Sequence, residues 1–192
     1  MTKTTRILAA AATALLAGVA LTGCTINLGT SGDHDMGMMG ESKATYTADD
    51  IMFMQMMIPH HQQAVDMGTL AETRASNPKV KALAAQIKAE QAPEIAEMKQ
   101  WLKDAGAGMT MNHSMTMSGM LTEAEMTKLE NSTGAEFDRL YLEGMIGHHE
   151  GAIEMAKMVI DSKTANTHAL GHAINDSQTK QIAYMKELLA KL

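Results

Sequence analysis

Apolar residues recur every three or four positions along most of the chain after residue 46, the spacing of one face of an α-helix. Thr47, with Asp50 three residues later, has the capping-box pattern of a helix start, and the apolar spacing continues to about Arg74. Asn77-Pro78 places a capping residue before a proline in a first helical turn, which predicts a second helix to about Lys103. Residues 47–104 therefore predict an αα-hairpin.

The same signals return in the second half of the chain. Thr122 with Glu125, and Thr133 with Glu136, predict two further helix starts, the second opening a long helix to about Ile160. A last helix is expected from about Thr167 to the C-terminus. No segment shows the period-two alternation of a β-strand, so the pattern predicts an all-α fold with a second hairpin in residues 122–192.

The two hairpins are copies of one sequence unit. Residues 53–67 align with residues 141–155 at a separation of 88, and both segments contain a Met-Ile-x-His-His motif. The second helices align at a separation of 87, through pairs such as Leu83/Leu170, Ile87/Ile174, Gln91/Gln178, Met98/Met185 and Leu102/Leu189. One hairpin cannot bury its own apolar face, so the repeat predicts an up-down four-helix bundle with a pseudo-two-fold axis.

The start of the chain has the features of a secretory signal. Lys3 and Arg6 precede a short apolar stretch, and Leu21-Thr22-Gly23-Cys24 resembles a bacterial lipobox, in which cleavage leaves Cys24 as the lipidated N-terminus. A plain secretory cleavage site is the alternative. Residues 1–23 are therefore predicted to be a signal peptide and residues 24–46 a flexible tether, placing the protein outside the cytoplasm on a membrane anchor.

Charge and cysteine content narrow the candidate chemistry. Loss of residues 1–23 would leave 14 basic and 22 acidic residues, a net charge of −8, which argues against nucleic acid as a partner. With the only cysteine lipidated, no thiol would remain for metal binding or catalysis. The chain nevertheless contains 20 methionines and only 3% aromatic residues, and an excess of thioethers of this size needs an explanation.

The His-His pairs and nearby methionines predict a metal site. At about 100° per residue, the histidines and several methionines of each copy border one buried helical face, while Glu143, Glu150 and Glu154 lie on the opposite face. We therefore expect every carboxylate near the histidines to face solvent, which argues against a carboxylate-bridged iron site. Thioether and imidazole suit Cu(I), and imidazole also serves Cu(II). The predicted metal ligands are Met57, His60, His61, Met67, Met145, His148, His149 and Met155.

Some of these residues have a plainer interpretation. A methionine at a core-facing helical position is often only packing, as for Met67, Met98, Met155 and Met185 taken singly. Gln91 and Gln178 lie on the apolar faces of their helices, where they either orient the imidazoles behind the metal or are simply polar core residues. The occurrence of the His-His pair at the same place in both hairpins favours metal binding, because a buried histidine without a partner is costly.

A second set of methionines lies in a linker, residues 105–121, that has no helical period. Packing does not explain exposed thioethers in such a segment, whereas capture of a soft ion does; the alternative is compositional drift in a low-complexity segment. The predicted loop ligands are Met109, Met111, His113, Met115 and Met117, and the tether repeats the composition in His34, Met36, Met38 and Met39.

The two blocks 57–67 and 137–155 resemble family 305 of domains of unknown function, the CopM-like proteins. The resemblance covers about residues 47–192 and rests on the doubled Met-Ile-x-His-His. It implies a ferritin-like four-helix bundle, an exported location, and binding of copper, in some members also silver, in handling or resistance. It implies no enzymatic activity. One departure is Pro59, which stands where the second copy has Gly147 and is expected to bend the first helix.

The sequence thus predicts an extracytoplasmic copper-binding protein, with Cu(I) favoured and Cu(II) also accommodated, that buffers or passes on the ion and catalyses no reaction. The protein that gives or receives the copper is not indicated. Two other functions stay open: a ferritin-like metal-dependent oxidoreductase, and a structural or interaction lipoprotein without metal.

Overall fold

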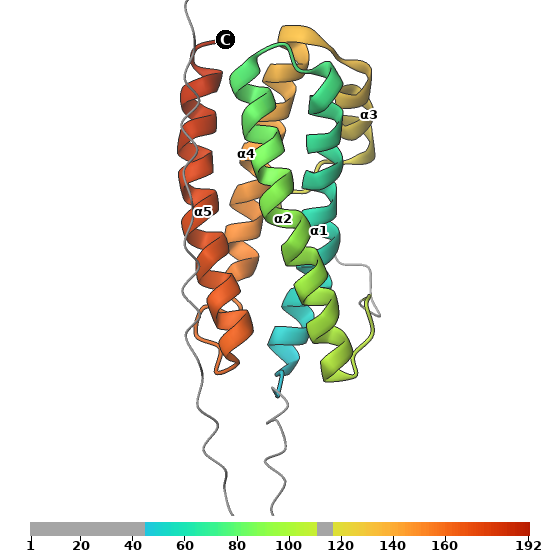
Figure 1. The fold of residues 1–192 in the computed structure, drawn as a ribbon, viewed down its shortest axis with the longest axis vertical. Coiled ribbons are helices and arrows are strands. Elements are labelled where there is room, and N and C mark those ends of the chain that lie inside the picture. The colour runs from blue at the N-terminus through green and yellow to red at the C-terminus, as the bar shows by residue number, and fades with distance from the viewer. Residues whose placement is uncertain (1–44, 111–116) are drawn as a thin grey trace, which may run out of the picture. The chain divides into compact units, whose positions relative to one another are not determined.

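The structure, a computed structural model, describes residues 45–110 and 117–192. The signal segment, Cys24, most of the tether and the linker residues 111–116 lie outside the described residues. Within these ranges the chain forms five helices and no β-strand: α1 (Ala48–Arg74), α2 (Pro78–Ala105), α3 (Glu123–Asn131), α4 (Gly134–Ala156) and α5 (Ala165–Leu189). The four long helices lie side by side, with the short α3 next to them (Figure 1). The predicted all-α four-helix bundle is confirmed.

Most helix starts coincide with the predicted caps. Thr47 with Asp50, and Thr122 with Glu125, form complete capping boxes, and the Asn77 side chain accepts a hydrogen bond from the Lys79 amide. Thr133 precedes α4 but its side chain makes no capping hydrogen bond. α1 continues through Pro59 and α2 through Pro93, so neither proline ends its helix.

The end of α4 differs from the prediction. The helix was expected to reach about Ile160 but stops at Ala156, and a turn follows. This turn buries Val159 completely, and its Cγ2 atom occupies the space that a Cβ atom on Gly171 would approach to 2.9 Å. Burial of this apolar side chain against α5 therefore accompanies the early exit from the helix.

Two buried carboxylates link the hairpins at the ends of α1 and α4. Near the start of α1, Asp50 accepts hydrogen bonds from the hydroxyls of Ser162, Thr164 and Thr167, which follow α4. Its counterpart 88 residues later, Asp138, accepts bonds from the backbone amides of Ser76 and Asn77, which follow α1. The start of each helix thus meets the end of the other, so α1 and α4 run antiparallel.

The hydrogen bonds to Asp50 also set its ionisation. Burial alone would raise the pKa of this carboxyl, but the bonds from Thr167, Ser162, Thr47 and Thr164 outweigh it and lower the pKa to about 2. The sequence pattern indicates Asp50 only as part of a helix cap and gives no sign of the role of Asp138.

The core consists of two apolar clusters, each containing residues from both hairpins. The Phe53 cluster comprises Phe53, Met54, Met56, Met57, Ile58, Ile95, Met98, Leu102, Ala152, Met155, Ala156, Val159, Leu170 and Ile174. The Phe137 cluster comprises Ala64, Met67, Ala71, Ala75, Val80, Leu83, Ala84, Ile87, Leu129, Phe137, Tyr141, Leu142, Met145, Met185 and Leu188. The repeat relates the two clusters, since Met57, Met98 and Met155 of one correspond to Met145, Met185 and Met67 of the other.

None of the helices in the described ranges combines the length and the apolar character needed to cross a bilayer.

Candidate metal centre

The four histidines of the repeated motif form a layer between the two apolar clusters. On α1, His60 and His61 follow Ile58 of the Phe53 cluster and precede Ala64 of the Phe137 cluster. On α4, His148 and His149 occupy the equivalent position in the reverse direction, and all four side chains are completely buried. The bundle core therefore changes from apolar to polar at its middle and back again.

The two His-His pairs meet across the pseudo-two-fold axis. The rings of His60 and His148 have centroids 3.7 Å apart with a 36° angle between their planes. Within each pair the centroids are farther apart, 6.4 Å for His60 and His61 and 6.2 Å for His148 and His149. The histidines of the two hairpins thus form one continuous cluster rather than two separate sites.

In every one of these histidines, the Nε2 atom lies against an oxygen acceptor. The partners are a backbone carbonyl for the two inner rings and a side-chain oxygen for the two outer ones. The contacts are His60 to Ser118 O at 3.1 Å, His148 to His60 O at 2.8 Å, His61 to Glu94 Oε2 at 2.8 Å and His149 to Gln181 Oε1 at 2.7 Å. An oxygen acceptor at Nε2 favours the tautomer that carries its hydrogen there and leaves a lone pair on Nδ1.

The Nδ1 atoms have no such partners. Each of the four is buried and makes no hydrogen bond to any residue that the structure describes. Leaving a buried polar atom unpaired costs on the order of 1–3 kcal/mol, and here the same cost recurs at four equivalent atoms. Unpaired lone pairs on buried imidazoles are the donors that a metal ion would use.

Burial also keeps three of these imidazoles, those of His60, His148 and His149, neutral. It lowers the pKa of His60 to about 3, with a further contribution from the nearby His61, and that of His149 to about 4. The pKa of His148 is lowered well below its ordinary value, first by burial and then by the proximity of His60. Because a metal ion binds only the deprotonated ring, the fold holds these three imidazoles in the form that binds metal at neutral pH.

The groups that orient the outer imidazoles are not the ones the sequence suggested. Gln91 and Gln178 are buried as expected. However, the Nε2 and Oε1 atoms of Gln91 and the Oε1 atom of Gln178 have no hydrogen-bond partner among the described residues. Glu94 and Gln181 hold His61 and His149 instead. These two residues are 87 positions apart, the separation of the second helices, so the repeat could have identified them as a pair.

Glu94 corrects a further expectation. The carboxylates of α4 do face solvent, but Glu94 comes from α2, and its carboxylate contacts the buried His61 ring while its side chain is 22% exposed. The prediction that every carboxylate near the histidines faces solvent is therefore wrong for Glu94. It considered the helices that carry the histidines and not the helices packed against them.

The predicted methionines are all buried, but each hairpin's pair is divided between the two clusters. Met57 lies in the Phe53 cluster with Met155, whereas Met67 lies in the Phe137 cluster with Met145. Met98 and Met185 join these two groups, one in each cluster. Thioethers from both hairpins thus gather on each side of the histidine layer.

The C-terminal end of the linker, near Ser118, lies against the histidine layer. Ser118 supplies the carbonyl that contacts His60, and the backbone of Ser118 and Gly119 occupies the space beside Gly151, where an added Cβ would meet Ser118 O at 2.0 Å. Further on, the amide of Gln63 makes two hydrogen bonds to the backbone of Leu121. At the first end, the Gln55 amide donates to the carbonyl of Gly108.

Of the predicted loop ligands, only two are described. Met109 is 45% exposed, and Met117 is partly buried against the Phe53 cluster. Met111, His113 and Met115 lie outside the described residues. The two described methionines therefore stand on the parts of the linker that adjoin the bundle.

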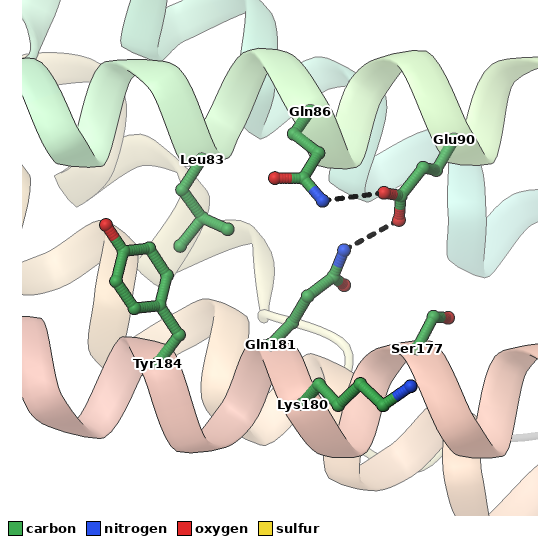
Figure 2. Close-up of a pocket in the computed structure, with 7 residues that line it drawn as sticks. All are labelled: Leu83, Gln86, Glu90, Ser177, Lys180, Gln181 and Tyr184. Atoms are coloured by element: carbon green, nitrogen blue, oxygen red, sulfur yellow. Dashed lines mark hydrogen bonds between the residues drawn. The ribbon is translucent and has the colours of Figure 1, made fainter.

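On the other side of the bundle, α2 and α5 border a pocket of about 310 Å³ that is lined mainly by polar residues. Figure 2 shows the Gln181 amide reaching from α5 toward Glu90 on α2, where it donates a hydrogen bond at 2.7 Å. The amide of Gln181 therefore connects this pocket to the buried ring of His149, whose Nε2 lies against the amide oxygen.

In the described ranges, no three His, Cys, Asp or Glu side chains are placed to hold a metal ion among themselves. An ion bound in this layer would therefore need donors of another kind beside the imidazoles. The methionines of the two adjoining clusters carry donors of such a kind.

Comparison with known proteins gives a consistent picture of the fold. The family described as "Domain of unknown function (DUF305)" matches residues 50–189. A solved structure of a DUF305 protein from Streptomyces coelicolor, named as a secreted protein, is 32% identical, with a TM-score of 0.72, and the match covers 76% of this chain and 95% of that one.

Solved structures of CopM are also similar. The Cu(I)-bound form is 30% identical with a TM-score of 0.63, and the Cu(II)-bound form is 32% identical with a TM-score of 0.62; each match covers 77% of this chain and 98% of CopM. CopM has also been solved with silver bound, at 30% identity over 77% of this chain and 97% of CopM, with a TM-score of 0.62. No functionally curated protein matches the chain.

Proposed function

Because the chain belongs to the DUF305 family, whose fold it shares with copper- and silver-bound CopM, we propose that it binds copper in its histidine layer. The observation that carries this proposal is the set of four buried Nδ1 atoms without hydrogen-bond partners among the described residues. Each belongs to a ring whose other nitrogen already has an oxygen acceptor, so the ring is oriented and only Nδ1 is left to bind.

The donor set favours Cu(I). His60, His61, His148 and His149 supply imidazole, and Met57, Met67, Met145 and Met155 supply thioether from the adjoining clusters. Soft thioethers select Cu(I), and Ag(I) resembles it in this respect, whereas the imidazoles also accept Cu(II). The metal is cargo in this role: the protein binds and releases the ion without turning over a substrate.

The linker would bring the ion to the layer. Met109 is exposed on the segment that begins at the end of α2, and Met117 immediately precedes the residue whose carbonyl contacts His60. Met111, His113 and Met115 stand between them in the sequence. Exposed thioethers of this kind would capture Cu(I) before it reaches the buried donors.

The proposed location is supported by the start of the sequence, which resembles a secretory signal followed by a lipobox. A signal peptide in residues 1–23 would direct export and be removed, and a lipid on Cys24 would then anchor the bundle outside the cytoplasm through the tether of residues 24–46. There the protein would buffer copper, or pass it to a partner, in a resistance role.

A titration of the metal-free protein with Cu(I) tests the proposal. We expect tight uptake by the full mature chain, a rise in its melting temperature at saturation, and copper–nitrogen and copper–sulfur scattering in X-ray absorption. Replacing all four histidines with Gln should abolish the tight sites. Uptake no tighter than that of a peptide spanning residues 106–120 would overturn the proposal.

Two controls separate ligand loss from misfolding. Met57→Leu with Met145→Leu keeps the core volume but removes two thioethers, so it should lower Cu(I) affinity more than Cu(II) affinity while the protein stays helical. Replacing the exposed His168 and His172 with Gln should leave tight Cu(I) binding unchanged, because both rings lie outside the core.

A further inference from the structure

Two histidines outside the buried layer form a pair on the surface of α5. His168 and His172 stand one helical turn apart, both are exposed, and their ring centroids are 4.6 Å apart at an interplanar angle of 68°. Residues four apart on a helix project from the same face, so the two imidazoles can reach one ion together without a change in the backbone. No prediction from the sequence used either residue.

We propose that His168 and His172 form a second metal site, which takes a divalent ion that favours imidazole, with Cu(II) bound most tightly. Two histidines at this spacing on one helix face are a known arrangement for chelating Zn²⁺, and Cu(II) exceeds Zn²⁺ in affinity for nitrogen donors. The remaining positions around the ion would be filled by water, since both side chains face solvent.

The donors differ in kind from those of the buried layer. No methionine occurs between residues 159 and 184, so no thioether lies within a helical turn of either histidine along α5. Without a soft donor, the surface pair should discriminate against Cu(I) and Ag(I), which the methionine clusters favour. One molecule would then carry, in addition to the buried layer, a surface site that binds Cu(II) in preference to Cu(I).

The fold itself does not require this pair. The equivalent positions in the first hairpin, 87 residues earlier, are Lys81 and Ala85 on α2, and both are also exposed. A bundle with the same core therefore tolerates a lysine and an alanine here. This difference provides a way to move the site to the other hairpin.

The experiment is a Cu(II) titration of the full mature chain, followed by electron paramagnetic resonance. The His168→Ala/His172→Ala variant should bind one Cu(II) fewer than the wild type, or bind that equivalent more weakly. Loss of a group that only supports a ligand weakens metal binding roughly 10–100-fold, so loss of both ligands should weaken it at least as much. Tight Cu(I) and Ag(I) binding should not change in this variant.

Two further variants exclude a general effect of surface histidine. Lys81→His with Ala85→His places the same pair on α2 and should add one Cu(II) equivalent. His172→Ala with Ala173→His keeps two histidines but turns one about 100° around the helix, so it should behave like the double alanine variant.

The proposal is overturned if the double alanine variant binds Cu(II) as the wild type does, or if the transplanted pair adds nothing. Helicity by circular dichroism checks that the variants fold, which is expected because all the substituted positions are exposed. Because the readout is a difference in Cu(II) equivalents between variants, it is independent of whether the buried layer binds copper.

Discussion

The two hairpins have the same core but different outer faces on α1 and α4. Both have buried histidines, and three buried methionines of the first hairpin have methionine counterparts in the second, whereas Met54 and Met56 correspond to Leu142 and Gly144. At three positions, α4 has glycine where α1 has a larger residue. The pairs are Met56/Gly144, Pro59/Gly147 and Gln63/Gly151.

The linker explains much of this difference. A Cβ on Gly151 would collide with Ser118, and one on Gly144 would approach the Leu121 side chain to 3.1 Å, so small residues on α4 make room for the passing chain. On α1, Gln63 instead holds the linker by its amide. A single linker cannot contact two related helices in the same way, so the repeat has diverged where the linker lies.

A second difference concerns the groups that hold the outer histidines. The first hairpin uses the carboxylate of Glu94 and the second the amide of Gln181. A charged and a neutral acceptor at equivalent positions make the two halves of the histidine layer electrostatically distinct.

The largest expected effect comes from the shared histidines, through pH. The folded-state pKa values of His60, His148 and His149 lie below the value of about 6.5 in an unfolded chain, so the unfolded state binds more protons between these values. The stability of the metal-free protein should be complete above about pH 6.5. Below that it should fall by about 1.4 kcal/mol per pH unit for each histidine that only the unfolded chain protonates.

Urea unfolding of the metal-free protein at pH 7.5 and 5.5 measures this loss. Equal stability at the two pH values would contradict the placement of neutral histidines in the core.

The next effect concerns the linker contact. Gly151→Ala should destabilise the protein by about 1–3 kcal/mol, because the added Cβ meets the Ser118 carbonyl and the backbone must shift. Gly147→Ala is the matched control: nothing lies within 4 Å of its added Cβ, so it should be neutral or stabilising, since alanine favours a helix over glycine by about 1 kcal/mol. Thermal unfolding measures the stability of both variants. Equal changes in stability would show that the linker does not pack against Gly151.

The third effect concerns the two buried carboxylates, Asp50 and Asp138, that link the hairpins. Asp50→Asn should cost about 2 kcal/mol at pH 7, because the lowered pKa reports how strongly the fold favours the charged carboxylate. This contribution is present above the unfolded value of about 3.9 and is lost as the pH falls through about 2. Chemical denaturation measures it, and Glu125→Gln in the exposed capping box of α3, which should cost less, is the comparison.

The smallest effect tests the difference between Glu94 and Gln181. Glu94→Gln makes the first hairpin resemble the second and should weaken copper binding about ten-fold, the lower end for loss of a group behind a metal ligand. Gln181→Glu makes the opposite change and should raise the pKa of His149 from about 4, because a nearby negative charge favours the protonated ring. Competition with a Cu(I) chelator measures the copper affinity of Glu94→Gln, and a nuclear magnetic resonance titration measures the pKa of His149 in Gln181→Glu. An unchanged affinity and an unchanged pKa would mean that these side chains do not act on the metal site.

Much of the fold could be predicted because its signals are local. Capping boxes at Thr47 and Thr122 and apolar spacing depend on residues within a few positions of each other, and the repeat required that the two hairpins pair. The end of α4 could not be predicted in this way, because Val159 leaves the helical path to pack against a glycine on the next helix.

The candidate site was harder to predict because its contacts cross between helices. A helical wheel places His61 on a buried face but cannot show that Glu94, 33 residues later, reaches it. In the same way, Met57 and Met67 share a hairpin but not a cluster, since residues ten apart along a helix are about 15 Å apart. Only the packing of the second hairpin brings Met155 to the side of Met57.

The division of the core has a consequence for how such a bundle can be assembled. Each apolar cluster is built from both hairpins, so one hairpin on its own would leave half of each cluster exposed. Two separate copies of it could complete both clusters only by associating about a two-fold axis, as a symmetric homodimer with His60 stacked on its own counterpart. In the present chain the linker makes that association intramolecular, so it no longer depends on protein concentration. Because the two halves are separate parts of one sequence, a substitution in one half leaves the other half unchanged.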